Sequence, residues 1–299
     1  MSAGLALGLI ASLAWGLVDI TGAMASRRLG SLRVLAGSQI VSLVALVGIV
    51  LLERSRLGDG AIDGVLVGLP LGVGAALAYL CYFTALRIGP LSVVSPVIVA
   101  YGGTTVVLAV LLRGETLQPA QIAGAVLATV GVVLAAIVFD GGSMRGARLV
   151  GPGVVVAIVT MLLFATLTVA LAAPIQDHGW LPVVLGSRLA NAMSALVLLV
   201  VVGRLRSRRL EVLTEPSVPA DRVSVGLVIV AGVFDIAAFA VYAVGLEIAP
   251  TWLVGLASSF GPVLAVAYAV WRLGERPRAT QWIGLAFLAV GVVVLAVAG

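Results

Sequence analysis

Three charged side chains, Asp19, Arg188 and Asp235, interrupt long runs of apolar residues. A charge near the middle of a lipid bilayer costs at least about 2.5 to 3.5 kcal/mol, so it persists mainly where it faces a cavity or an oppositely charged partner. Carboxylate and guanidinium groups in such a place can bind a charged substrate, form an internal ion pair or carry a proton. If the apolar runs cross a membrane, these three residues therefore predict an internal polar site.

The composition indicates that the apolar runs do lie in lipid. Of the 299 residues, 62% belong to the set AVILMFWYC and 10% are charged, and the mean hydropathy is +1.22. Soluble domains are about 45 to 50% apolar and about 25% charged, so this chain has too few polar residues to cover its apolar ones in water. A polytopic membrane protein, with the lipid bilayer as its surroundings, is the class that fits.

The placement of the basic residues and the single cysteine argue against two classes of function for this chain, namely nucleic-acid binding and metal-cluster chemistry. All 18 basic residues are arginines and give a net charge of +5, but almost all of them flank the apolar runs. This placement favours a role in membrane orientation over binding of nucleic acid. Cys81 is the only cysteine, which excludes an internal disulfide and a thiolate metal cluster. No nucleotide, haem or metal motif is present, so we expect no cofactor and no bound metal.

The apolar runs are long enough to cross a bilayer ten times. A membrane-spanning helix needs about 20 mostly apolar residues. The chain is therefore predicted to be all-α, with ten transmembrane helices. They are expected at residues 3–25, 33–52, 65–86, 91–112, 119–139, 150–173, 180–203, 223–246, 250–271 and 279–298.

The two halves of the chain are similar to each other. At an offset of 160, Ala78 to Ala136 matches Ala238 to Ala296 without gaps, and at an offset of 149 the start of each half also aligns. The matched pairs include Tyr82/Tyr242, Gly114/Gly274, Glu115/Glu275, Gly30/Gly179 and Gly37/Gly186. We therefore predict a five-helix repeat in residues 1–139 and a second in residues 140–299. Because five is odd, the second repeat enters the membrane from the opposite side, which is typical of secondary transporters with a substrate site between the halves.

The depth of the charged residues predicts which of them meet. With a rise of about 1.5 Å per residue and a core of about 30 Å, Arg188 lies about 12 Å below one face and Asp235 about 18 Å below the other, so their depths coincide. A static ion pair and a substrate or proton site are both compatible with this. Asp19 has no basic residue at its own depth, although Arg27 lies two turns further on and could reach back.

Polar and aromatic residues at helical spacing are expected to line the same site. The repeat relates Gln39 to Arg188 and Ser42 to Asn191, which places polar groups in both halves. We expect Arg188 to bind a substrate carboxylate or to exchange it with Asp235, and Asp19 to be the better proton carrier, because low dielectric disfavours an unpaired charge. The predicted substrate-binding residues are Trp15, Gln39, Tyr79, Tyr82, Arg188, Asn191 and Tyr242, and the predicted ion-pair or proton-coupling residues are Asp19, Arg188 and Asp235.

Several motifs together resemble a known family. They are Trp15-Gly16, Gly114-Glu115-Thr116 and Gly274-Glu275-Arg276, the pattern Gln-x-x-Gly-x(6)-Gly at Gln121 and Gln281, and Pro262. Over its whole length the chain resembles the ten-helix drug/metabolite transporter superfamily, in its EamA-type branch of amino-acid and metabolite exporters. The resemblance implies alternating access around a central cavity. Gly102, where the repeat predicts a proline, and Asp19, where many relatives have an uncharged polar residue, depart from the pattern.

Within this framework we expect an exporter of small polar or amphipathic metabolites, such as amino acids, in the cell membrane, and we expect it to work as a monomer and not as an enzyme. A flippase for a lipid-linked headgroup would use the same two halves and stays open as an alternative. A remote alternative is an intramembrane hydrolase, in which Ser259 would be the nucleophile and His178, the sole histidine, the base. On the Gly-Glu motifs, a turn and helix-cap role is favoured over a role in gating.

Charge and resemblance predict opposite orientations. Fourteen arginines flank the spans on the side away from the amino terminus, against three on the amino-terminal side. Arginine-rich loops face the cytoplasm, so this bias places both termini outside. The family resemblance implies both termini in the cytoplasm. The fourteen are Arg27, Arg28, Arg33, Arg87, Arg145, Arg148, Arg204, Arg206, Arg208, Arg209, Arg222, Arg272, Arg276 and Arg278, and the three are Arg54, Arg56 and Arg113.

Overall fold

The structure is a computed structural model of the chain. It describes residues 2–53, 57–58, 60–89, 91–136, 152–205, 221–261, 264, 267–268, 271–272 and 279–297. The described part of the first half forms α1 (Ser2–Leu29), α2 (Ser31–Leu52), α3 (Ala61–Ile88), α4 (Leu91–Val99), α5 (Tyr101–Arg113) and α6 (Pro119–Ala136). That of the second half forms α7 (Pro152–His178), α8 (Trp180–Leu205), α10 (Arg222–Ile248), α11 (Thr251–Ala257), the short 3₁₀ helix η4 (Ser258–Phe260) and α13 (Ala279–Val297).

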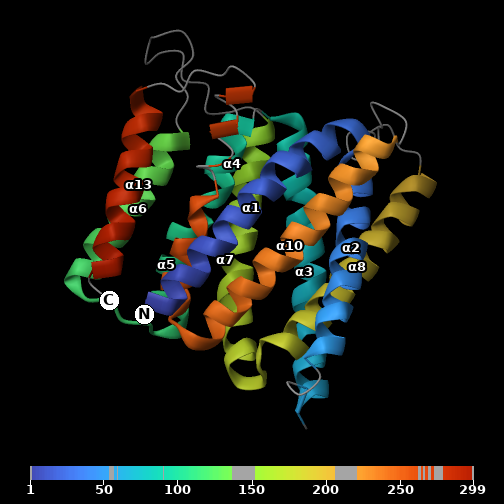
Figure 1. Ribbon diagram of the computed structural model, residues 1–299, viewed down its shortest axis with the longest axis horizontal. Coiled ribbons are helices and arrows are strands. Elements are labelled where there is room, and N and C mark those ends of the chain that lie inside the picture. The colour runs from blue at the N-terminus through green and yellow to red at the C-terminus, as the bar shows by residue number, and fades with distance from the viewer. Residues whose placement is uncertain are drawn as a thin grey trace.

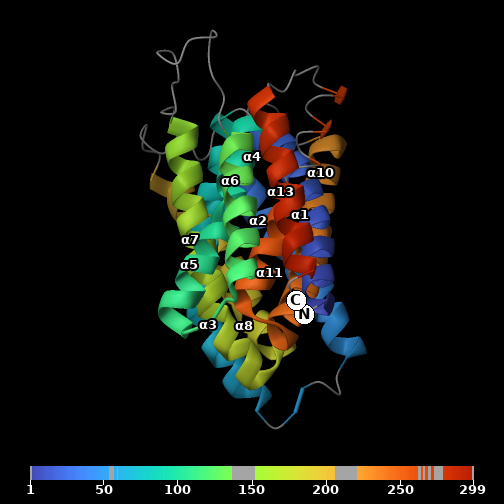
Figure 2. The same cartoon turned by 90° about the vertical axis from the view of Figure 1, so that its left-hand side faces the viewer.

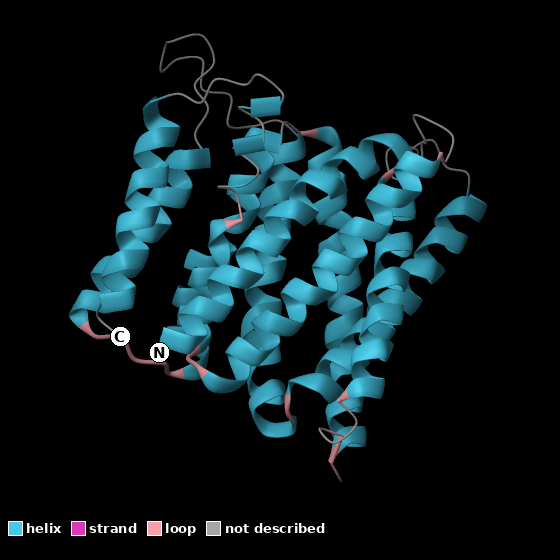
Figure 3. Cartoon of the chain, viewed as in Figure 1, coloured by secondary structure: helices cyan, strands magenta, loops and turns pink. Residues whose placement is uncertain are grey.

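The predicted all-α polytopic membrane fold is confirmed. Six of the described helices are long and apolar enough to cross a membrane, and shorter apolar helices occupy the other predicted spans. Figure 3 shows helices throughout and no strand in the part of the chain that is described. The antiparallel helices stand side by side, and both chain ends lie at the same end of the bundle (Figure 1). An even number of crossings requires that arrangement.

The predicted fourth span differs from the expectation because it consists of two helices. α4 ends at Val99 and α5 begins at Tyr101. Gly102 and Gly103 follow this break, and glycine is about 1 kcal/mol less favourable than alanine in a helix interior. Gly102 also lies against the carbonyl oxygen of Gly255 in α11, so the break accompanies a close crossing of the fourth and ninth spans.

Two one-residue turns occupy equivalent places in the two halves. Gly30 separates α1 from α2 with φ of 85°, and Gly179 separates α7 from α8 with φ of 79°. Positive φ favours glycine because a Cβ would be strained there. Gly114 ends α5 with φ of 64° in the left-handed conformation, so the first Gly-Glu motif forms the helix end that was predicted for it. The second motif, Gly274-Glu275-Arg276, and Pro262 lie outside the described residues.

Helix packing follows the inverted repeat. α3 packs along α8, and the repeat equivalents of these two helices, α10 and α2, pack along each other in the same way. Likewise α1 packs on α10, and their repeat equivalents, α7 and α3, pack on each other. α6 and α13, the last helices of the two repeats, lie side by side at the left-hand edge of the bundle in Figure 1, the side that faces the viewer in Figure 2. The inverted repeat is therefore a property of the structure as well as of the sequence. The boundary predicted between residues 139 and 140 falls outside the described residues and stays a prediction.

Two glycines let the symmetry-related crossings come close. Gly72 in α3 faces the carbonyl oxygen of Ser187 in α8, and its repeat equivalent Gly232 in α10 faces the carbonyl oxygen of Ser38 in α2. A Cβ atom at Gly232 would lie 2.6 Å from that oxygen. Neither helix pair could pack as it does with a larger residue, which explains why small residues occur at these crossings.

We expect Gly232→Ala to destabilise the protein by about 1 to 3 kcal/mol, the usual cost of overpacking. The matched control is Gly226→Ala on the same helix, because a Cβ atom there would meet nothing within 4 Å. Thermal unfolding of the detergent-purified protein measures both. Equal melting temperatures for the two variants would contradict the role given to this crossing.

Candidate functional site

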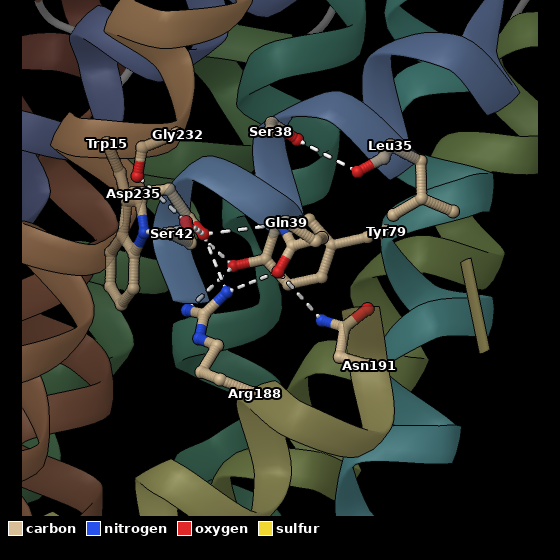
Figure 4. Close-up of polar contacts among 10 residues, drawn as sticks. All are labelled: Trp15, Leu35, Ser38, Gln39, Ser42, Tyr79, Arg188, Asn191, Gly232 and Asp235. Atoms are coloured by element: carbon tan, nitrogen blue, oxygen red, sulfur yellow. Dashed lines mark hydrogen bonds and ion pairs between the residues drawn. The ribbon is translucent and has the colours of Figure 1, made fainter. Parts of the chain in front are cut away.

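An ion pair joins α8 to α10 inside the bundle. Nη1 of Arg188 lies 2.6 Å from Oδ2 of Asp235. Each residue is 1% exposed. The depths estimated from the sequence left such a pair open, and the structure places the two charged groups in contact (Figure 4).

The carboxylate of Asp235 is surrounded by donors from four helices besides α10. Its Oδ1 accepts hydrogen bonds from Tyr79 at 2.5 Å and from Trp15 Nε1 at 3.3 Å. Its Oδ2 accepts from Arg188 at 2.6 Å, Ser42 at 3.2 Å and Gln39 Nε2 at 3.4 Å. A carboxylate offers about four lone-pair positions. Asp235 therefore has little capacity left to accept from a substrate.

The guanidinium of Arg188 is less completely satisfied. Nη1 also donates to Oε1 of Gln39 at 2.8 Å, and Nη2 donates to the Tyr79 hydroxyl at 3.4 Å. The group also lies over the ring of Phe239, 4.2 Å from its centroid. Its Nε has no hydrogen-bond partner although it is buried. The Nε–H of this buried cation is therefore unpaired.

Asn191 lies one turn after Arg188 on α8 and supports the same network. Its Nδ2 donates to Oε1 of Gln39 at 3.0 Å, while its Oδ1 has no partner. Figure 4 shows the two side chains coming from α8 towards Gln39 of α2. Arg188 and Asn191 both line a cavity, so an unpaired donor and an unpaired acceptor belong to residues at its wall.

A second carboxylate, Asp19 of α1, lies in the same cavity wall with different neighbours. The Tyr82 hydroxyl of α3 donates to Oδ1 at 2.6 Å, and the Ser95 hydroxyl of α4 donates to Oδ2. Asp19 is 5% exposed and makes no ion pair with any residue that the structure describes. Arg27 does not reach back to it, since its Nη2 donates to the Gly89 carbonyl oxygen at 2.9 Å.

Both repeats contribute to one central cavity of about 90 Å³. A single water needs about 10 to 15 Å³ by the same measure, so the space exceeds that of one water. Trp15, Tyr79, Tyr82, Arg188, Asn191 and Tyr242 line it, together with Asp19 and Asp235. Gln39 is fully buried and lies behind the wall, where it holds Arg188 and Asn191 in place. That any of these residues binds a substrate stays a prediction.

The walls of the cavity follow the pseudo-twofold symmetry. The hydrogen bond from Tyr82 to Asp19 has its equivalent in the bond from Tyr242 to Thr168, at 3.0 Å. The ring pair of Trp15 and Tyr242, with centroids 5.2 Å apart, corresponds to Phe164 and Tyr82, 5.9 Å apart. The offsets that relate these residues, 149 and 160, are those read from the sequence.

The three charges break this symmetry. Asp19 corresponds to Thr168, Arg188 to Gln39 and Asp235 to Ala75. The cavity thus has two similar aromatic walls but an asymmetric charge distribution, with the ion pair on α8 and α10 and the lone carboxylate on α1.

Sequence reasoning missed several lining residues. Phe164 and Phe239 line the cavity and correspond to Trp15 and Tyr79 in the repeat, so the alignment of the two halves held the signal that could have found them. Tyr101 of α5 and Ser258 of η4 both line the cavity and hydrogen-bond to each other. No sequence signal indicated this contact, because it depends on how the broken fourth and ninth spans cross.

Glu115 of the first Gly-Glu motif caps a helix of the other repeat. Its carboxylate accepts from the backbone N–H of Thr251 at 3.3 Å and of Trp252 at 3.1 Å, in the first turn of α11. Arg113 lies 3.1 Å from the same carboxylate. The motif therefore ends α5 in the first repeat and caps α11 in the second repeat, so it connects the two halves.

The arrangement around Ser259 does not support a hydrolase. The hydroxyl donates to the Gly255 carbonyl oxygen at 3.2 Å, and neither it nor Ser258 hydrogen-bonds to His178. His178 is the last residue of α7, at the end of the bundle. A nucleophile and its base must lie within hydrogen-bond reach.

Asp235→Ala should destabilise the protein by about 3 to 5 kcal/mol, because it leaves the Arg188 cation buried without its partner. The double variant Arg188→Gln/Asp235→Ala reproduces the residues of the first repeat, Gln39 and Ala75, and should recover much of that loss. Thermal unfolding in detergent compares the two. If the double variant is no more stable than Asp235→Ala, the unpaired Arg188 cation is not the cause of the destabilisation in the single variant.

Comparison with known proteins agrees with this geometry. The family model of the EamA-like transporter family matches residues 2–137 and 151–297. A solved structure named "Crystal structure of protein" superposes with a TM-score of 0.71 at 23% identity, covering 98% of this chain and 96% of that chain, which shows a shared fold and no more. No curated protein matches the chain. With both halves matched by one family model, the chain belongs to the EamA-like transporter family, a family of membrane transporters of the drug/metabolite type.

Proposed function

We propose that the protein is a secondary transporter of the cell membrane that exports small polar or amphipathic metabolites such as amino acids. The observation that carries this proposal is the central cavity, which both repeats line and which combines aromatic walls with buried charges. Rocking of the two halves would expose such a site to each side of the membrane in turn. One chain supplies both halves, so we propose that it works as a monomer.

The unpaired polar atoms suggest how a zwitterionic metabolite would be held. Arg188 offers an unpaired Nε–H and Asn191 an unpaired Oδ1. A substrate carboxylate would bind the guanidinium, either at this free position or in exchange with Asp235. The exchange would couple substrate binding to the contact between α8 and α10, since those helices carry the pair.

Reconstituted vesicles separate this function from that of a lipid flippase. Wild-type protein should take up labelled amino acids, whereas a flippase would change the accessibility of lipid headgroups in the same vesicles. Arg188→Gln should abolish the uptake while the protein stays inserted, because glutamine lacks the charge for a carboxylate. Unchanged uptake kinetics in Arg188→Gln would remove this residue from the mechanism, and headgroup movement without uptake would favour the flippase.

We further propose that Asp19 carries the coupling proton. Its charged form has only the neutral hydroxyls of Tyr82 and Ser95 as partners in the described structure, whereas Asp235 faces the Arg188 cation. Low dielectric disfavours an uncompensated charge, so a proton is the compensating charge that we propose Asp19 takes up and releases. The other titratable groups that line the cavity are the hydroxyls of Tyr79, Tyr101 and Tyr242.

Uptake driven by a pH difference across the vesicle membrane should therefore be lost in Asp19→Asn, which cannot exchange a proton. Asp235→Asn is not a neutral control, because it breaks the ion pair, but any activity that it retains should keep its dependence on pH. Full pH dependence in Asp19→Asn would show that another group, or no proton at all, drives transport.

A further inference from the structure

The two carboxylates of the cavity differ in how their charge is compensated. Asp235 accepts five hydrogen bonds, one of them from the Arg188 guanidinium. Asp19 accepts two, both from uncharged hydroxyls. Among the described residues, none donates to the other two of its approximately four lone-pair positions. The charges that line the cavity, Arg188, Asp235 and an ionised Asp19, sum to one negative charge.

A buried charge without a counter-charge is costly, and a proton or a cation must compensate it. The Arg188 cation cannot do so for Asp19, because it is engaged by Asp235 at 2.6 Å. Arg27 is engaged by the Gly89 carbonyl oxygen. When the proton leaves Asp19, the compensating charge has to come from whatever occupies the cavity.

Aromatic rings surround the space next to Asp19. Trp15 lies one turn before it on α1 and lines the same cavity. Tyr82 donates to the carboxylate and packs against Phe164, with ring centroids 5.9 Å apart, and the ring centroid of Tyr101 lies 6.1 Å from that of Phe164. The negative faces of aromatic rings attract cations, tryptophan most strongly. A carboxylate among such rings is suited to a positively charged nitrogen.

We propose that Asp19 and the rings of Trp15, Tyr82, Tyr101 and Phe164 form a binding site for the protonated amine of the substrate. The inference rests on the proposed transport function and names the group that selects the substrate. An ammonium group would take the free lone pairs of Asp19 and displace its proton to solvent, so that one positive charge replaces another. Amines with an apolar body fit the aromatic walls, whereas an anion without an amine would add to the negative charge.

The repeat supplies a variant that tests this without disturbing the packing. Thr168 occupies the position equivalent to Asp19 and accepts the corresponding tyrosine hydrogen bond from Tyr242 at 3.0 Å. Asp19→Thr therefore keeps a partner for Tyr82 while removing the carboxylate. Asp63→Asn is the matched control, because Asp63 is an exposed carboxylate in the first turn of α3, away from the cavity.

Isothermal titration calorimetry of the purified protein in detergent would measure binding of phenethylamine, 2-phenylethanol and phenylacetate, which share a ring and differ in head-group charge. Wild type and Asp63→Asn should bind phenethylamine at least about tenfold more tightly than 2-phenylethanol, a difference of about 1.4 kcal/mol, and phenylacetate most weakly. Asp19→Thr and Asp19→Asn should lose this preference. Repeating the titration in buffers of different ionisation enthalpy measures the protons released on binding. Wild type should release a proton when it binds phenethylamine, whereas Asp19→Thr and Asp19→Asn should not.

Equal binding of phenethylamine and phenylacetate by wild type, or a preserved preference in correctly folded Asp19→Thr, would overturn the inference. Helical circular dichroism and gel filtration establish that the variants fold. The outcome is independent of the transport assay. An amine preference that depends on Asp19, in a protein that moves no substrate in vesicles, would support this site and contradict the proposed transport function.

Discussion

The need to compensate charge inside a lipid-embedded bundle governs the centre of this structure. Arg188 and Asp235 can be buried together at 1% exposure because a 2.6 Å ion pair and hydrogen bonds from three further helices replace their hydration. Removing water from two charges costs more than their attraction returns unless the remaining donors and acceptors are also satisfied. Trp15, Ser42 and Tyr79 meet that condition for the carboxylate, so the first repeat stabilises a pair that belongs to the second.

The duplication gives the two halves the same helix packing, and a few residues that differ between the halves provide the charged groups of the site. Repeat-related crossings such as Gly72 on Ser187 and Gly232 on Ser38 give the two halves the same close packing. Within that packing, Gln39 and Ala75 in one half stand where Arg188 and Asp235 stand in the other. Symmetric packing and asymmetric charge are separable, because the packing depends on backbone approach and the charge on single side chains.

Sequence reasoning reached the fold and the common depth of Arg188 and Asp235 but not the detailed wall of the site. Hydropathy, the offsets of 149 and 160 and the coincident depth of Arg188 and Asp235 are all one-dimensional quantities, and the sequence contains them. The direction in which a side chain points around its helix is not a one-dimensional quantity of this kind. Gln39 was therefore expected in the cavity but lies behind its wall, and the contact of Tyr101 with Ser258 was missed because it requires the crossing of α5 and η4.

The contacts that join the halves at the two ends of the bundle differ in strength. At the end near the amino terminus, the partly buried carboxylate of Glu115 accepts hydrogen bonds from two backbone N–H groups of α11. Separation of the two halves there would leave those donors unpaired. At the opposite end, Arg28 and Asp221 form an exposed pair at 3.2 Å, and such pairs contribute about 0 to 1 kcal/mol. Hydrogen bonding from Ser224 at the start of α10 is the main reason that the pKa of the Asp221 carboxyl lies below its ordinary value, and Arg28 lowers that pKa less. Among the contacts of the described residues, the side-chain pair at the Arg28 end is therefore easier to break than the helix cap at the Glu115 end.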